Sequence, residues 1–273
     1  MLAAAVAFLA AAGALRAETV PLKAVSHIHG IAVDPADPQR LYLATHHGLY
    51  RTKPGGAAER VSNHRDDLMG FTPHPSDPGT FYASGHPERG GNLGFIVSTD
   101  GGVSWRQIAA GVKGPVDFHQ MDISRSDPNV IYGAYGGLQR SADGGKSWRM
   151  VGPAPQGLID LAVAPENADA LYAATQTGLL ISRDAGRSWA PAMILKRPTS
   201  MVESAADGNV YAYVVGTGLM RRDGANWTTL GALPGERFIL YFAAAKDRFY
   251  AVTQRGEILE SRDSGRSWQP YGG

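Results

Sequence analysis

The histidines are the side chains of this chain with the clearest capacity for chemistry, and they are unevenly distributed. There are eight, none of them after position 119: His27, His29, His46, His47, His64, His74, His86 and His119. A neutral imidazole nitrogen is a common ligand for transition-metal ions. Because the chain contains no Cys, thiolate ligands and thiol nucleophiles are excluded. The histidines therefore indicate a localised site in the first part of the chain.

A repeated Asp-Pro pair, at 37–38, 77–78 and 127–128, relates some of these histidines to one another. The residues eight positions before each Asp are His29, Met69 and His119. The residues ten positions before each Asp are His27, Asp67 and Asp117. Met121 follows His119 by two positions, and a spacing of two keeps side chains on one face of a strand. If these segments are neighbouring inner strands, the side chains gather around a common axis.

The residue types narrow the choice of metal. Imidazole nitrogen combined with the thioether sulfur of Met69 and Met121 favours copper. Without the Met residues in the shell, His with Asp67 or Asp117 would suit zinc or iron. We expect copper first, with zinc or iron as alternatives. The predicted inner ligands are His29, His119 and Met69; those completing the shell are His27, Met121 and Asp117; those gating it from loops are His46, His47 and His86. The competing interpretation is that these histidines are solvated loop residues.

A second pattern, Ser-x-Asp-x-Gly-x-Ser-Trp, predicts the elements that would position this site. It occurs at 98–105, 141–148, 182–189 and 261–268, and a box one residue shorter lies at 221–227. A period of roughly 40 residues built from short β-rich runs is typical of a propeller or solenoid. The Asp can accept N–H groups within a tight turn, and the Gly two positions later can take a positive φ. Each Trp can pack between neighbouring repeats.

This box resembles the Asp-box of the BNR-repeat proteins, which include sialidases, the sortilin ectodomain and photosystem II assembly factors. The resemblance covers most of the chain. It implies a β-propeller with each box between the third and fourth strands of a blade. It implies no single activity, because enzymes, receptors and assembly factors share the box.

A Tyr in each repeat and a Gly before each third strand indicate six blades. The Tyr residues are Tyr42, Tyr82, Tyr132, Tyr172, Tyr211 and Tyr250. We therefore expect an all-β, six-bladed propeller forming a single domain over 18–273. The expected blades lie near 26–63, 64–112, 113–154, 155–195, 196–232 and 233–273. An insertion at 85–93 lengthens a loop of blade two.

The propeller topology predicts where the histidines lie. In a four-stranded blade, the start of the inner strand and the loop from the second to the third strand share one end, and the boxes lie at the other. Seven histidines then converge on one rim, and only His74 falls at the box end. The metal site should therefore lie at the rim of blades one to three.

The N-terminus and the composition bear on location and partners. Residues 2–15 form an Ala-rich apolar run that stops at Arg16-Ala17-Glu18. Such a run is typical of a signal peptide and is short for a bilayer span. We expect 1–17 to be a signal peptide, cleaved after Ala17 or kept as an anchor, and the protein to be periplasmic or secreted. The net charge of +1 does not indicate binding to nucleic acid. We also expect a monomer, with no membrane span after residue 17.

Two alternatives use other residues. A glycosidase would use paired carboxylates at the rim, for which the candidates are Asp66, Asp67, Asp117, Asp122, Asp160 and Glu203. The resemblance to sialidases implies three clustered Arg, but only Arg65 and Arg89 lie near that rim, and the Phe/Tyr-Arg-Ile-Pro motif is missing. A protein-assembly scaffold would use a basic face at the boxes, formed by Arg183, Arg187, Arg221, Arg222, Arg262 and Arg266.

The sequence thus favours an exported, non-catalytic binding protein with a metal ion, and no catalytic or organic-cofactor residues are assigned. A protein partner is a further expectation. If the protein is an enzyme, the expected class is a glycosidase-like hydrolase.

Overall fold

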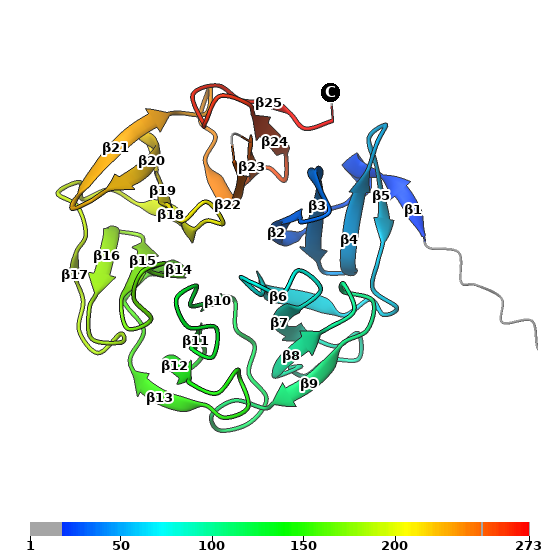
Figure 1. The fold of residues 1–273 in the computed structure, drawn as a ribbon, viewed down its shortest axis with the longest axis horizontal. Coiled ribbons are helices and arrows are strands. Elements are labelled where there is room, and N and C mark those ends of the chain that lie inside the picture. Colours follow the sequence, from blue (N-terminus) through cyan, green and yellow to red (C-terminus); the bar gives the residue numbers. More distant parts are fainter. Residues whose placement is uncertain (1–17, 247, 273) are drawn as a thin grey trace, which may run out of the picture.

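Six antiparallel sheets surround a common axis in a computed structural model of the protein, which describes residues 18–246 and 248–272 (Figure 1). The expected signal peptide, 1–17, lies outside the described residues. Each sheet is one blade, and the four strands of the repeat lie in sequence order from the axis outward. The prediction of an all-β, six-bladed propeller is confirmed.

The strand bounds follow the repeat. Blade one contains β2 (Ile28–Asp34), β3 (Asp37–Thr45), β4 (Gly48–Lys53) and β5 (Ala57–Arg60). Blades two and three contain β6 (Asp67–Pro73), β7 (Phe81–His86), β8 (Phe95–Ser98), β9 (Arg106–Ala109), β10 (Gln120–Ile123), β11 (Ile131–Ala134), β12 (Leu138–Ser141) and β13 (Arg149–Gly152). Blades four to six contain β14 (Leu158–Val163), β15 (Leu171–Thr175), β16 (Gly178–Ser182), β17 (Ala190–Pro191), β18 (Thr199–Ser204), β19 (Val210–Val214), β20 (Gly218–Asp223), β21 (Asn226–Gly231), β22 (Ile239–Ala245), β23 (Arg248–Thr253), β24 (Ile258–Ser261) and β25 (Gln269–Pro270).

Blade one has a fifth strand that the repeat did not predict. β1 (Thr19–Pro21) pairs antiparallel with the outer strand β5, and the short 3-10 helix η1 (Leu22–Ala24) leads from it toward β2. Three residues are too few to show a period of two in the sequence. The extra strand covers the outer edge of blade one, where β5 would otherwise present unpaired backbone groups.

The Asp-box closes the turn between the third and fourth strands of a blade, as the resemblance implied. In blade three, Asp143 accepts hydrogen bonds from the Ser147 hydroxyl at 2.6 Å, the Ser147 N–H at 2.9 Å and the Ser141 hydroxyl at 2.8 Å. These bonds, those from Ser147 foremost, lower the pKa of Asp143 to about 2. Gly145 has a φ of 85° and lies against the ring of Phe95, so a side chain there would meet both strain and a clash.

The core lies between the blades, and the box Trp residues pack into it. Trp148 lies 5.2 Å from Phe95 of blade two and 4.8 Å from Phe118, measured between ring centroids. Its Nε1 donates to the carbonyl of Gly145 at 3.0 Å, which fixes the ring to the box. The shorter box at 221–227 forms a tight hairpin instead, in which Asp223 pairs with Asn226.

The ring closes without a shared sheet, because blade one comes entirely from the N-terminal part of the chain and blade six entirely from the C-terminal part (Figure 1). Side chains join the two blades. The Tyr250 hydroxyl donates to the carbonyl of Pro38 at 2.6 Å, and the Tyr271 hydroxyl donates to the carbonyl of Gln39 at 2.7 Å. Across the described residues, no helix has the length and apolar character needed to cross a membrane.

Candidate metal centre

Blades one and two bring together a first group of three donors. His29 comes from β2, His46 from the β3–β4 turn and Asp67 from the start of β6. His29 Nε2 lies 3.8 Å from Asp67 Oδ1, and His46 Nε2 lies 3.5 Å from Asp67 Oδ2. The three donor atoms all lie within 4.8 Å of one another, so they could bind one ion. We call this group the first triad.

A second triad lies on blades two and three. Asp117 Oδ2 lies 2.7 Å from His119 Nε2 and 3.1 Å from His86 Nε2. His86 ends β7, and its other ring nitrogen, Nδ1, lies 2.8 Å from the carbonyl of Gly91 in the inserted loop. An N–H at Nδ1 would leave the Nε2 lone pair of a neutral ring directed at Asp117. Carbonyl contacts of this kind orient metal-binding imidazoles in proteins.

The two triads form one electrostatic cluster. Burial raises the pKa of Asp67, and the nearby His46 and His86 oppose that rise. Burial lowers the pKa of His29 to about 4, helped by the charges of His46 and His119. His29 is therefore neutral at pH 7 and offers a free lone pair, as a metal ligand must. The pKa of His119 is raised instead, because its hydrogen bond to Asp117 stabilises the protonated ring.

Three donor atoms of the triads are buried without a hydrogen-bond partner among the described residues. They are His29 Nε2, Asp67 Oδ1 and Asp117 Oδ1. Leaving a buried polar atom unpaired costs about 1–3 kcal/mol, and more for a charged group. A cation bound at the first triad would satisfy His29 Nε2 and Asp67 Oδ1 together, so the residues present there fit a metal ion.

His27 and His47 lie beside the triads and belong to neither. The His27 ring stacks on His46 at 4.7 Å, and His46 stacks on His29 at 4.5 Å. His27 precedes β2 and has a φ of 51°, so the two-residue spacing from His29 does not place both on one strand face. His47 is exposed, and its N–H donates to Thr45 Oγ1.

Both predicted sulfur ligands are buried. Met121 packs in an apolar cluster between blades two and three with Tyr82, Phe118 and Ile123. Met69 is buried on β6, two residues after Asp67. Nitrogen and oxygen atoms alone make up the two triads. Asp67, which the sequence indicated as a carboxylate ligand for zinc or iron, lies in the first triad.

The other histidines and several candidate carboxylates have local partners. His64 Nδ1 lies 3.1 Å from Asp66 Oδ2, and His74 lies in the β6–β7 turn at the box end. Asp122 accepts the N–H of Val163 from the next blade at 2.7 Å.

The basic face at the boxes is partly neutralised. Arg222 pairs with Glu166 at 2.6 Å, and Arg262 pairs with Glu260 at 2.6 Å. These two arginines therefore have acidic partners within this chain, and both pairs lie partly exposed to solvent.

Solved structures with the same fold are known. Over 93% of this chain, the structure resembles the GH74 xyloglucanase from Xanthomonas campestris with a TM-score of 0.61 and 20% identity. Also over 93%, it resembles YCF48 bound to a D1 peptide, with a TM-score of 0.56 and 19% identity. YCF48 from Cyanidioschyzon merolae gives a TM-score of 0.56 at 18% identity. This chain spans 47% of the xyloglucanase and 84% and 88% of the two YCF48 chains. No protein-family model and no curated protein matches the sequence.

These likenesses establish the fold and leave the activity open. With the boxes seen in the structure, they confirm the predicted resemblance to Asp-box β-propellers. One similar protein is a xyloglucanase and another binds a peptide, so the shared fold carries different functions. Function has to be argued from the site.

Proposed function

We propose that the protein is an exported, non-catalytic binding protein that holds a divalent transition-metal ion at the rim of blades one to three. One observation carries the proposal: two His/Asp triads converge there, and in the first of them His29 Nε2 and Asp67 Oδ1 are buried without a hydrogen-bond partner among the described residues. Solvated loop histidines would not need buried carboxylates beside them. The exposed sides of His46 and His119 leave a path for an ion to enter.

The donor atoms favour a borderline divalent ion. Imidazole nitrogen with carboxylate oxygen suits Cu(II), Zn(II) and Fe(II), and at a given nitrogen and oxygen site Cu(II) binds more tightly than Zn(II). Copper therefore remains the first candidate and zinc the second. Binding of Cu(I) would require sulfur from Met69 or Met121. Each triad offers three donors, so we expect one ion per chain and at most two.

The test is a metal titration of protein purified without an affinity tag and stripped with EDTA. Cu(II) and Zn(II) are added in competition with a chromophoric chelator. The double variant His29→Ala/His119→Ala removes one imidazole from each triad and should lose at least 100-fold in affinity. His74→Ala, at the box end, is the matched control and should bind like the wild type. Equal metal affinity in the double variant and the wild type would refute the assignment.

A protein partner is the second candidate function, supported by the likeness to YCF48 bound to a D1 peptide. It predicts stoichiometric peptide or protein binding that persists after EDTA treatment and in the His29→Ala/His119→Ala variant. A glycosidase, by analogy with the xyloglucanase, predicts turnover of xyloglucan fragments. Metal retention without turnover of xyloglucan fragments would favour the main proposal over the glycosidase. Metal retention without peptide or protein binding would favour it over the partner-binding function.

A further inference from the structure

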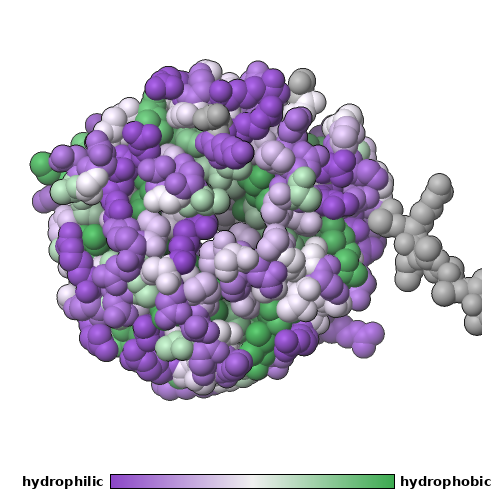
Figure 2. Space-filling model, viewed as in Figure 1, coloured by the Kyte–Doolittle hydropathy of each residue, from purple (hydrophilic) through white to green (hydrophobic). Residues whose placement is uncertain are grey.

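A cavity of about 610 Å³ runs along the propeller axis. The inner strands of all six blades line it, and the face of the molecule in Figure 2 is hollowed near its centre. His29 and His119 belong to its lining, so the cavity extends inward from the rim site. Its volume lies within the range of roughly 300–1,000 Å³ that is usual for small-molecule sites.

One half of the channel wall is acidic. Asp122 on β10, Asp160 on β14 and Glu203 on β18 line it from blades three, four and five. Arg125 is the one cation on that side of the described lining, and its Nε donates to the carbonyl of Ser204 at 2.6 Å. Three carboxyl groups thus face a single guanidinium.

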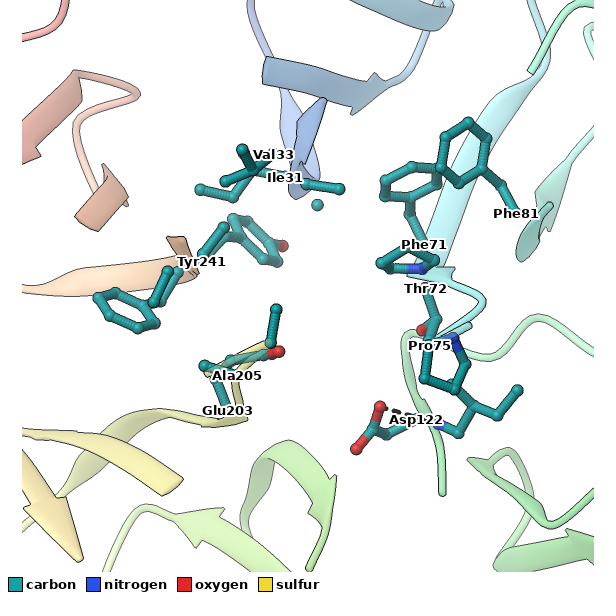
Figure 3. Close-up of a pocket in the computed structure, with 18 of the residues that line it drawn as sticks. Ile31, Val33, Phe71, Thr72, Pro75, Phe81, Asp122, Glu203, Ala205 and Tyr241 are labelled. Atoms are coloured by element: carbon teal, nitrogen blue, oxygen red, sulfur yellow. Dashed lines mark hydrogen bonds between the residues drawn. The ribbon is translucent and has the colours of Figure 1, made fainter. Parts of the chain in front are cut away.

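Two of these carboxyl groups have structural roles, and the third has none. Asp122 Oδ2 accepts the N–H of Val163, and Asp160 Oδ2 accepts the N–H of Val202 at 3.0 Å, so each ties its blade to the next. Glu203 has no hydrogen bond or ion pair in the part of the chain that the structure describes. Glu203 is half-buried and lines the channel from β18 (Figure 3). A half-buried carboxyl group that opens onto a cavity and has no protein partner is free to pair with a cationic ligand group.

The opposite half of the wall is apolar. Ile31 and Val33 of blade one, Phe71 of blade two and the ring of Tyr241 of blade six face the same open space (Figure 3). Burial, with the nearby Asp160, raises the pKa of Tyr241 to about 12, so its hydroxyl stays neutral. The inner strands therefore present carboxyl groups on blades three to five and mainly apolar side chains on blades six, one and two. The other charged lining residues, Asp34, Asp77 and Lys246, lie at the end of β2 and in the turns after β6 and β22, at the box end.

We propose that this channel binds a small organic cation, an ammonium group on an apolar body, with Glu203 as the partner of the ammonium. A metal ion fits less well, because among the described residues only the two rim triads bring three His, Asp or Glu donor atoms within 4.8 Å of one another. An ammonium group needs no such cage. It donates hydrogen bonds to carboxylates on one side while its apolar body packs against the other wall.

The raised pKa values of the channel carboxyl groups are consistent with the same ligand. Burial raises the pKa of Glu203 well above its usual range, and the charges of Asp122, Asp160 and Asp207 add to the effect, against Arg125. Burial also raises the pKa of Asp160 to about 7. A bound cation would lower these pKa values, so binding at pH 7 should release protons.

The test compares 4-phenylbutylammonium with 4-phenylbutan-1-ol, a neutral analogue of nearly the same shape, by calorimetry. Both titrations are made in EDTA, so the result does not depend on the rim metal. The ammonium should bind at least tenfold more tightly than the alcohol. Its heat should differ between phosphate and Tris buffers, because released protons are taken up by the buffer. Equal affinities, or no ammonium binding up to about 10 mM, would overturn the proposal.

Two variants locate the site. Glu203→Gln keeps the volume and removes the charge, and should weaken ammonium binding at least tenfold while leaving the alcohol unchanged. The control Glu236→Gln lies on the exposed surface and should bind like the wild type. Val33→Phe narrows the channel from the apolar wall without altering a carboxylate, and should weaken both ligands. Unchanged ammonium binding in folded Glu203→Gln would show that the ammonium does not pair with Glu203. Unchanged binding of both ligands in Val33→Phe would show that they do not bind in the channel.

Discussion

Asp117 Oδ2 lies 2.7 Å from His119 Nε2, and the same oxygen lies 3.1 Å from His86 Nε2. One buried carboxylate thus lies between two imidazoles from different segments, the residue before β10 and the end of β7. Its second oxygen, Oδ1, is buried without a partner among the described residues. The arrangement is a preorganised donor group, because the rings are positioned before any ion binds.

Replacing Asp117 by Asn should therefore weaken metal binding. The amide keeps the shape but loses the charge and one of the two acceptors, so we expect at least a tenfold loss of Cu(II) or Zn(II) affinity, as for other groups that orient metal ligands. Chelator competition measures the loss. Asp127→Asn, in the box-end turn after β10, is the control. An unchanged affinity in Asp117→Asn would remove the second triad from the site.

The adjacent residues His46 and His47 provide a sharper comparison. Both are in the β3–β4 turn, but only His46 reaches Asp67, at 3.5 Å. We expect His46→Ala to lower metal affinity at least tenfold and His47→Ala to change it less than twofold. Since the two substitutions alter the same turn, a difference between them reports ligation rather than folding. Equal losses would show that the turn, not the imidazole of His46, matters.

The fold was predictable because its signals are local and repeated. The box at 141–148 carries its Asp, Gly and Trp in positions that the turn, the positive φ of Gly145 and the ring contact of Trp148 each require. Each further copy of the box predicts the same turn in its own blade. β1 was missed because it is a single short strand outside the repeat, and its partner β5 lies 36 residues or more away in the sequence.

The site was predictable in part. The Asp-Pro alignment found His29, His119 and Asp117, because equivalent inner-strand positions face one axis. His46 and His86 were predicted to gate the site from the loops, yet they supply donors to the two triads, because the β3–β4 turn and the end of β7 bring their rings onto Asp67 and Asp117. No sequence period reports such loop conformations.

The acidic half of the channel should make stability depend on pH. The pKa of Asp160 is about 7 in the folded protein, against 3.8 for the free side chain. Between these values the folded state holds a proton that the unfolded state releases, so this group's contribution to stability falls as pH rises from about 4 to 7. We expect Asp160→Asn to flatten that part of a melting-temperature profile, with exposed Asp169→Asn as the control. A parallel profile in Asp160→Asn would show that Asp160 ionises normally in the fold.

The contact between blades one and six should be where the ring opens first. Tyr250 and Tyr271 donate to the backbone carbonyls of Pro38 and Gln39. The five other junctions are also crossed by the chain as it passes from blade to blade, and this one is not. The double variant Tyr250→Phe/Tyr271→Phe keeps the rings but removes both hydroxyls, which should cost about 1–3 kcal/mol in the free energy of unfolding, measured in urea.

Hydrogen exchange gives the location as well as the size of that effect. Amides of β2, β3 and β23 should exchange faster in the double variant, because local opening there no longer breaks the two hydrogen bonds. Tyr132→Phe is the matched control, since the Tyr132 hydroxyl donates to the carbonyl of Ala168 at the junction of blades three and four. That variant should raise exchange only at its own junction. Uniformly faster exchange over all six blades in the double variant would mean that the ring unfolds as one unit, with no weak junction between blades one and six.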